Sequence, residues 1–214
     1  MMRILILGAS GTAGDLLDII DALAARGEKI ACAGLLDDTR NKGEQVHGHP
    51  VLGRIADAGR FPDCLLVNAV GSDRTFAARP EIVERAGRDG FATLVHPAAS
   101  VSPRARLGAG VHVGPGAVVA SGVVVGDHVA IHPGCVIGHD CAIGAYTIVA
   151  PGACVSGHVR VGRGCYLGTR SVIRQLLSVG DGALVGMGAV VTRDVPAGAT
   201  VIGVPARGAG QPEA

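Results

Sequence analysis

The sequence predicts an α/β region over residues 1–95 followed by a parallel β-helix over residues 96–214. Two observations support this prediction. Residues 3–38 have the order strand, glycine loop, helix and strand, and from Val101 onward an aliphatic residue recurs at every sixth position. Most of the 34 glycines lie beyond residue 100, so the glycine content of the chain also changes near the boundary between the two regions.

The first part begins with RILIL (3–7), which predicts a strand, and continues through glycines 8, 11 and 14 into an amphipathic helix up to residue 23. KIACAGLLDD (29–38) predicts a second strand and CLLVNAVG (64–71) a third. This order predicts a Rossmann-like βαβ unit whose loop opens a helix N-terminus, where a phosphate or pyrophosphate binds. A purely structural tight turn would also explain the loop. Asp37, however, lies 23 residues after Gly14, about where an acid meets a ribose diol.

The second part has a period of six residues, and its aliphatic series is unbroken over sixteen positions from Val101 to Val191. Glycine follows the aliphatic residue at nine of them, and small or β-branched residues stand four places after most of them. Six residues therefore form one short strand and one corner, where glycine is expected to supply backbone freedom. Three sides close a coil of eighteen residues, so residue i lies under residue i+18.

Composition excludes several classes of function. A net charge of +1 with 17% charged residues gives no field for nucleic acid or a membrane surface, and five aromatics without Trp give no base-stacking platform. No apolar run is long enough to span a membrane, and ILIL (4–7) is too short for a signal segment. The six cysteines lack CxxC spacing, and Cys135, Cys141 and Cys165 occupy the small inward place of the repeat. We therefore expect a cytoplasmic protein with buried, unreactive thiols.

One stretch departs from the repeat's apolar and glycine composition. VIGHDCAIG (136–144) places His139 and Asp140 side by side at a corner, where both side chains would face solvent or a neighbouring subunit. The pair is compatible with a solvated corner, with a metal site or with an acid–base device. An imidazole, whose ordinary pKa lies near neutrality, suits the last of these.

The repeat resembles the hexapeptide-repeat acyltransferases, which implies a left-handed parallel β-helix and a homotrimer. The order GASGTAG, GLLDD, AVG, TLVHPAASVS and then hexads resembles more specifically the sugar acetyltransferases of bacterial glycan biosynthesis, over residues 3–207. The family includes bacillosamine and perosamine N-acetyltransferases and a sialic acid O-acetyltransferase group. This resemblance implies acetyl transfer from acetyl-CoA to the amino group of a nucleotide-linked sugar, with O-acetylation as the alternative.

The resemblance also implies residue roles. His139 would take the proton from the sugar amine, and Asp140 would orient the imidazole. Acetyl-CoA would contact Ile148, Gly157, Thr169, Ser178 and Met187, with the Gly157 amide near the acetyl oxygen. The nucleotide-sugar would contact Ser10, Gly11, Thr12, Asp37, Asp38 and Gly71, and no metal is expected. Ile148 and Thr12 stand where many relatives have histidine, so the sugar stays open.

Three other functions remain open. A zinc enzyme of the γ-class carbonic anhydrase type would use the histidines of the repeat (112, 128, 132, 139 and 158), although they stand at mixed places in the hexad. A non-catalytic trimer would bind a nucleotide without transfer. An oxidoreductase would bind NAD at the glycine loop but lacks a recognisable catalytic set.

The coil arithmetic gives one further expectation. His158 lies eighteen residues after Asp140, so the two should stack on one edge, where Asp140 could be shared between His139 and His158. The alternative is that His158 fills a glycine-type corner and points to solvent.

Overall fold

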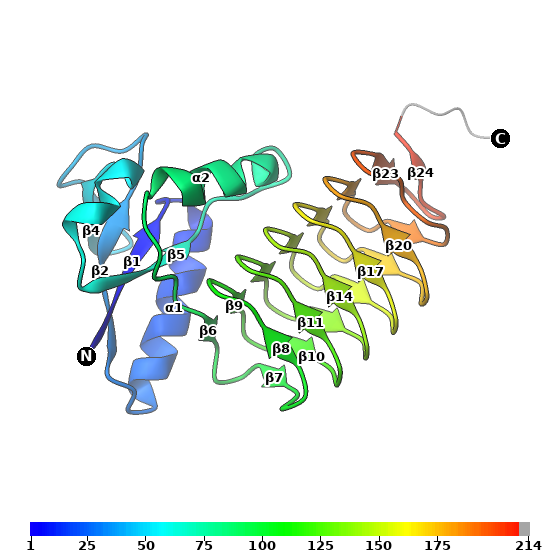
Figure 1. Ribbon diagram of the computed structural model, residues 1–214, viewed down its shortest axis with the longest axis horizontal. Coiled ribbons are helices and arrows are strands. Elements are labelled where there is room, and N and C mark those ends of the chain that lie inside the picture. The colour runs from blue at the N-terminus through cyan, green and yellow to red at the C-terminus, as the bar shows by residue number, and fades with distance from the viewer. Residues whose placement is uncertain (210–214) are drawn as a thin grey trace.

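The computed structural model describes residues 1–209; residues 210–214, the end of the range predicted for the β-helix, lie outside it. Figure 1 shows an α/β region at one end of the molecule, packed beside the first coils of a long β-helix. No helix among the described residues is long and apolar enough to cross a membrane.

The α/β region is built on a five-stranded sheet of order β3-β4-β2-β1-β5. β1 pairs in parallel with both β2 and β5, β2 pairs in parallel with β4, and β3 and β4 are antiparallel. The elements are β1 (Met2–Leu7), α1 (Gly11–Ala25), β2 (Ile30–Leu36), β3 (Gln45–Val46), β4 (His49–Gly53), the 3-10 helix η1 (Ile55–Arg60), β5 (Cys64–Asn68), the 3-10 helix η2 (Phe76–Ala78) and α2 (Arg79–Arg85).

The predicted strand–loop–helix is confirmed, because β1 is followed by a glycine loop and α1. The apolar face of α1, which includes Leu16, Ile19, Ile20 and Leu23, is buried on the sheet. The short pair β3–β4, both 3-10 helices and α2 were not predicted, since each is too short to show a clear period.

The β-helix consists of three ladders with six, five and eight strands, all parallel except that β24 pairs antiparallel with β23. The strands are β6 (Leu94–Val95), β7 (Ser100–Val101), β8 (Arg106–Leu107), β9 (His112–Val113), β10 (Val118–Val119), β11 (Val124–Val125), β12 (Ala130–Ile131), β13 (Val136–Ile137), β14 (Ala142–Ile143), β15 (Ile148–Val149), β16 (Cys154–Val155), β17 (Arg160–Val161), β18 (Tyr166–Leu167), β19 (Val172–Ile173), β20 (Ser178–Val179), β21 (Leu184–Val185), β22 (Val190–Val191), β23 (Thr200–Ile202) and β24 (Arg207–Gly208).

The predicted stacking of residue i on residue i+18 is confirmed, as when Ile137 pairs with Val155 and Val155 with Ile173. The aliphatic series points inward, and each member from Val113 to Val191 is buried. The coil shortens at its end, where Val185 pairs with Val201. The first strand of the helix is β6, one hexad before Val101, because Val95 pairs with Val113.

The structure corrects the role of the glycines. Positive φ occurs three places after each aliphatic residue, at every sixth residue from Gly110 to Gly188. The glycines directly after the aliphatic residue, such as Gly138, are required for space instead: a Cβ there would lie 2.7 Å from the Gly157 backbone nitrogen of the next coil. The period alone could not separate these two reasons for glycine.

Candidate active site

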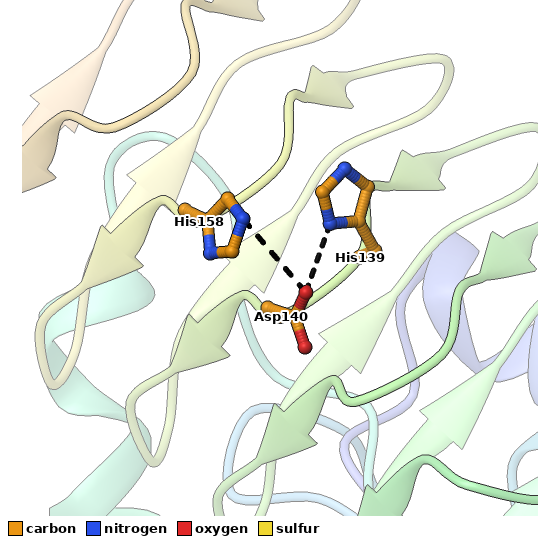
Figure 2. A group of neighbouring side chains, drawn as sticks. All are labelled: His139, Asp140 and His158. Atoms are coloured by element: carbon orange, nitrogen blue, oxygen red, sulfur yellow. Dashed lines mark hydrogen bonds and ion pairs between the residues drawn. The ribbon is translucent and has the colours of Figure 1, made fainter.

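His139 and Asp140 form a hydrogen-bonded pair at the corner between β13 and β14 (Figure 2). His139 Nδ1 lies 2.9 Å from Asp140 Oδ2. Their side chains are 61% and 53% exposed, so the pair is open to a substrate. Because a carboxylate oxygen accepts hydrogen bonds, the Nδ1–H of His139 is the donor of this bond, and Nε2 is the ring nitrogen left to accept a proton from a substrate.

The next coil supplies the remaining groups at this corner. The His139 ring covers Gly157 so closely that a Cβ there would lie 2.7 Å from Nε2. Among the described residues no acceptor takes the Gly157 N–H. The His158 N–H donates to the His139 carbonyl at 2.9 Å, which fixes the two coils relative to each other. His139 Nε2, a proton acceptor, therefore lies next to the Gly157 N–H, which has no acceptor among the described residues.

The predicted stacking of His158 on Asp140 is confirmed. His158 Nε2 lies 3.8 Å from Asp140 Oδ2, the same oxygen that His139 contacts, and the two imidazole rings meet edge to face with centroids 4.9 Å apart (Figure 2). His158 is turned toward the carboxylate, although its side chain is 52% exposed.

Cys141 is adjacent to this pair but points inward. Its side chain is buried, and its thiol donates to the Ser156 carbonyl at 3.0 Å. Burial raises the pKa of the Cys141 thiol, which suppresses the thiolate that nucleophilic attack needs. The histidine–aspartate pair is the reactive feature of this corner.

The same three side chains could also hold a metal ion. Among the described residues, His139, Asp140 and His158 are the group whose ligand atoms all lie within 4.8 Å of one another. In the structure the imidazole and the carboxylate are hydrogen-bonded directly to each other at 2.9 Å. Zinc at about 2.0 Å from each ligand would have to break that hydrogen bond.

The other residues predicted to contact acetyl-CoA lie at different places on the helix. Ser178 is an exposed outward residue of β20, and Thr169 and Met187 stack on the corner that follows the eight-stranded ladder. Ile148 lies on the eight-stranded ladder and is 1% exposed, packed against Gly71 of the α/β region. Of the five residues predicted to contact acetyl-CoA, Gly157 is the one that lies next to His139 of the same chain.

A second site lies at the carboxyl end of β1 and β2, in a cavity of about 400 Å³. Its lining includes Ser10, Asp37, Asp38 and Gly71, four of the residues predicted to bind the nucleotide-sugar. Ser10 is the N-cap of α1 and makes no side-chain capping hydrogen bond with the described residues, so its hydroxyl and the N–H groups of Gly11 and Thr12 are available to a phosphate. Gly11 opens α1 and Thr12 follows in its first turn.

The two aspartates of this cavity are already engaged by the chain. Asp37 accepts hydrogen bonds from the Ala9 and Arg40 backbone and from both the backbone and hydroxyl of Thr39. Burial raises the pKa of Asp37, but these hydrogen bonds outweigh it and lower the pKa overall. Asp38 accepts from Arg85 at 2.5 Å and from the Ile55 N–H. Both carboxylates therefore shape the cavity loops.

The His139 corner and this cavity lie on different sides of the β-helix. The α/β region packs on the first part of the eight-stranded ladder and its edge, where Arg79 donates to the His128 carbonyl and Phe76 packs on Tyr166. His139 lies between a strand of the six-stranded ladder and a strand of the five-stranded ladder. One chain does not bring the two sites together.

The buried polar residues between the two regions were not predicted from the sequence. Arg79 is 1% exposed and donates to the Val70 and His128 carbonyls, both at 2.6 Å. Burial and then the nearby Arg79 lower the pKa of His132 to about 4. His112 is buried beside it without a hydrogen-bond partner among the described residues. Histidines at outward places of a hexad give no sign that another region covers them.

Comparisons with known proteins begin with the repeat. The family model "Bacterial transferase hexapeptide (six repeats)" matches residues 122–157, and "Hexapeptide repeat of succinyl-transferase" matches residues 105–127 and 158–193. A comparison with curated protein sequences gives no significant match.

Solved structures match the chain over nearly its whole length. The acetyltransferase domain of PglB from Neisseria gonorrhoeae, in complex with acetyl coenzyme A, is 35% identical with a TM-score of 0.85, over 96% of this chain and 98% of that one. PerB from Caulobacter crescentus, in complex with CoA and GDP-perosamine, is 31% identical with a TM-score of 0.84, over 97% of each chain. The chain belongs to the hexapeptide-repeat sugar acetyltransferase family.

Membership of this sugar acetyltransferase family covers both regions, since the matches extend through the α/β region as well as the β-helix. WeeI from Acinetobacter baumannii is a further match at 28% identity with a TM-score of 0.83, over 97% of this chain and 100% of that one. The prediction made from the order of motifs is confirmed.

Proposed function

We propose that this protein transfers the acetyl group of acetyl-CoA to the amino group of a nucleotide-linked amino sugar, in the biosynthesis of a bacterial surface glycan. The observation that carries the proposal is the exposed His139 with a free Nε2, beside the unpaired Gly157 N–H, in a chain that also has a nucleotide-sized cavity. Relatives matched over 97–98% of their length hold acetyl-CoA, or CoA together with a nucleotide-sugar.

In this proposal the neutral sugar amine attacks the thioester carbonyl directly. His139 Nε2 takes the amine proton as the tetrahedral intermediate forms, and Asp140 stabilises the resulting imidazolium through Nδ1–H. The Gly157 N–H faces the developing oxyanion. The intermediate then collapses, the carbon–sulfur bond breaks, and CoA leaves as the thiol by taking from the His139 imidazolium the proton that the amine had lost, which regenerates the neutral base. No covalent enzyme intermediate is required, which agrees with the buried state of Cys141.

The cavity at the glycine loop would hold the nucleotide part of the substrate in a Rossmann-like domain. Ser10, Gly11 and Thr12 would present the positive end of α1 to the phosphates. Asp37, Asp38 and Gly71 would shape the wall around the ribose. Because both aspartates already accept hydrogen bonds from the chain, ribose recognition would use their remaining lone pairs.

The active unit would be a homotrimer of left-handed β-helices, with each site shared between two copies. The six-stranded ladder presents Val118, Val136 and Val172 outward, 38%, 40% and 39% exposed. A stripe of valines on one face is suited to burial against a second copy. Thr169 and Met187 flank one side of this ladder, and His139 and Gly157 flank the other. A neighbouring copy would bring the two edges together around one acetyl-CoA.

The test is a transfer assay with a panel of nucleotide amino-sugars and acetyl-CoA, reading the release of free CoA thiol and the mass of the product. We expect an increase of one acetyl group on the amine of at least one sugar in the panel. Hydroxy-sugar analogues without the amine are the control. Transfer to those analogues alone would make the protein an O-acetyltransferase. Binding of the nucleotide-sugar without transfer would make it a non-catalytic trimer.

A further inference from the structure

The corner that carries His139 has side chains where the fold favours glycine. Gly122, Asp140 and His158 occupy the same place in three successive coils, with φ of 73°, 59° and 58°. A left-handed backbone costs a residue with a side chain roughly 1–2 kcal/mol. Leu176 continues the row on the next coil with φ of 64°, so a left-handed φ is not by itself a sign of function. Asp140 and His158 differ from Leu176 because both are polar and lie directly beside His139.

The two side chains meet at one oxygen. Asp140 Oδ2 lies 2.9 Å from His139 Nδ1 and 3.8 Å from His158 Nε2, so the carboxylate stands between two imidazoles (Figure 2). The Asp140 carboxylate also lies over Gly122, where a Cβ would collide with it. Its position is therefore limited by Gly122 below, His139 beside it and His158 above.

The Asp140 carboxylate needs these contacts because it lies in an exposed part of the molecule. All three side chains are more than half exposed, and an ion pair or hydrogen bond in water is weakened by the entropy of holding its partners. His139 and Asp140 are neighbours in sequence, and the backbone alone does not select one rotamer of the carboxylate. A second group on the far side of the same oxygen reduces the freedom of Asp140.

We propose that His158 is a positioning residue, which holds the Asp140 carboxylate against His139 Nδ1 and so keeps His139 Nε2 as the nitrogen that faces the substrate. His158 acts through Asp140 and contacts no reacting atom. The inference rests on the proposed function, in which His139 accepts the amine proton.

The backbone provides a substitution that keeps the fold. His158→Gly removes the side chain at a place where other coils have glycine, so the variant should fold at least as well as the wild type. His158→Asn keeps a donor on a residue that tolerates this backbone conformation. His47→Gly is the matched control, because His47 is exposed, has φ of 50° and lies in the α/β region.

We expect His158→Gly to lower kcat by about three- to tenfold with KM for both substrates within about twofold, and His158→Asn to recover most of the loss. In a His139→Asn background, His158→Gly should have no further effect, since it acts through His139. An unchanged kcat, a loss that adds to that of His139→Asn, or a rise confined to the KM of acetyl-CoA would overturn the proposal.

A second measurement does not depend on transfer. Nitrogen-15 chemical shifts of the His139 ring report which nitrogen carries the proton. We expect the wild type to hold one tautomer, with the proton on Nδ1, and His158→Gly to show a mixture. The same tautomer distribution in both proteins would contradict the positioning role. Failure of the transfer assay in the wild type would instead reject the proposed function.

Discussion

The His139 ring lies where a side chain on Gly157 would stand, with Nε2 2.7 Å from the position of a Cβ. This contact joins the proposed base to the proposed oxyanion donor across two coils. Neither residue can be changed without an effect on the other, so the contact can be tested from the glycine side.

Gly157→Ala should displace the His139 ring and lower kcat by about 10- to 100-fold. Gly157 does not have positive φ, so alanine is compatible with the backbone, and the melting temperature should change little. Steady-state kinetics and thermal unfolding check both parts. Gly59→Ala, where a Cβ meets nothing within 4 Å, is the control. A wild-type kcat in Gly157→Ala would show that catalysis does not depend on the present position of the His139 ring.

His139→Asn should lower kcat by about 100-fold or more while acetyl-CoA binds with similar affinity, because the ring is used for proton transfer and not for binding. Isothermal titration with acetyl-CoA and single-turnover kinetics separate the two effects. If more than about a third of the turnover survives, His139 is a polar corner residue and the proposed mechanism is wrong.

Mixed oligomers should reveal that a site is shared between copies. Ser10→Glu would repel the phosphates from the cavity, and His139→Asn would remove the base from the other side of the helix. Each variant alone should be nearly inactive. Co-expressed in equal amounts, they should recover about a quarter of wild-type activity, because about a quarter of the interfaces pair two intact halves. No recovery would place both halves of the site in one chain.

Stability should fall in mild acid because of the histidines between the two regions. Burial lowers the pKa of His132 from 6.5 to about 4 and holds that of His112 well below 6.5. Between these values the unfolded chain binds protons that the folded chain excludes, so stability is complete above about pH 6.5 and is lost toward pH 4, by roughly 3 kcal/mol for His132.

Urea unfolding between pH 7.5 and 4.5 would measure this loss. His132→Asn should flatten the dependence, since asparagine does not titrate. His47→Asn is the control, as His47 is an exposed histidine in the α/β region. A slope in His132→Asn equal to that of the wild type would show that other groups cause the acid sensitivity.

The sequence by itself determined the parts of this protein that depend on local period and spacing. An aliphatic residue at every sixth position specified the β-helix, its coil of eighteen residues and its buried interior, because each coil repeats the same contacts with its neighbours. The same arithmetic placed His158 on Asp140, since vertical neighbours in a solenoid are separated by a constant number of residues. The strand, glycine loop and first helix were equally local.

Only the tertiary structure decided how the two regions meet. The burial of Arg79, His112 and His132 depends on which face of the β-helix the α/β region covers, and no period records that choice. The same docking buries Ile148 against Gly71 and separates the cavity from His139 within one chain. Contacts between segments that are distant in sequence depend on the shapes and charges of both surfaces. They are therefore defined by the tertiary structure and not by the local sequence of either segment.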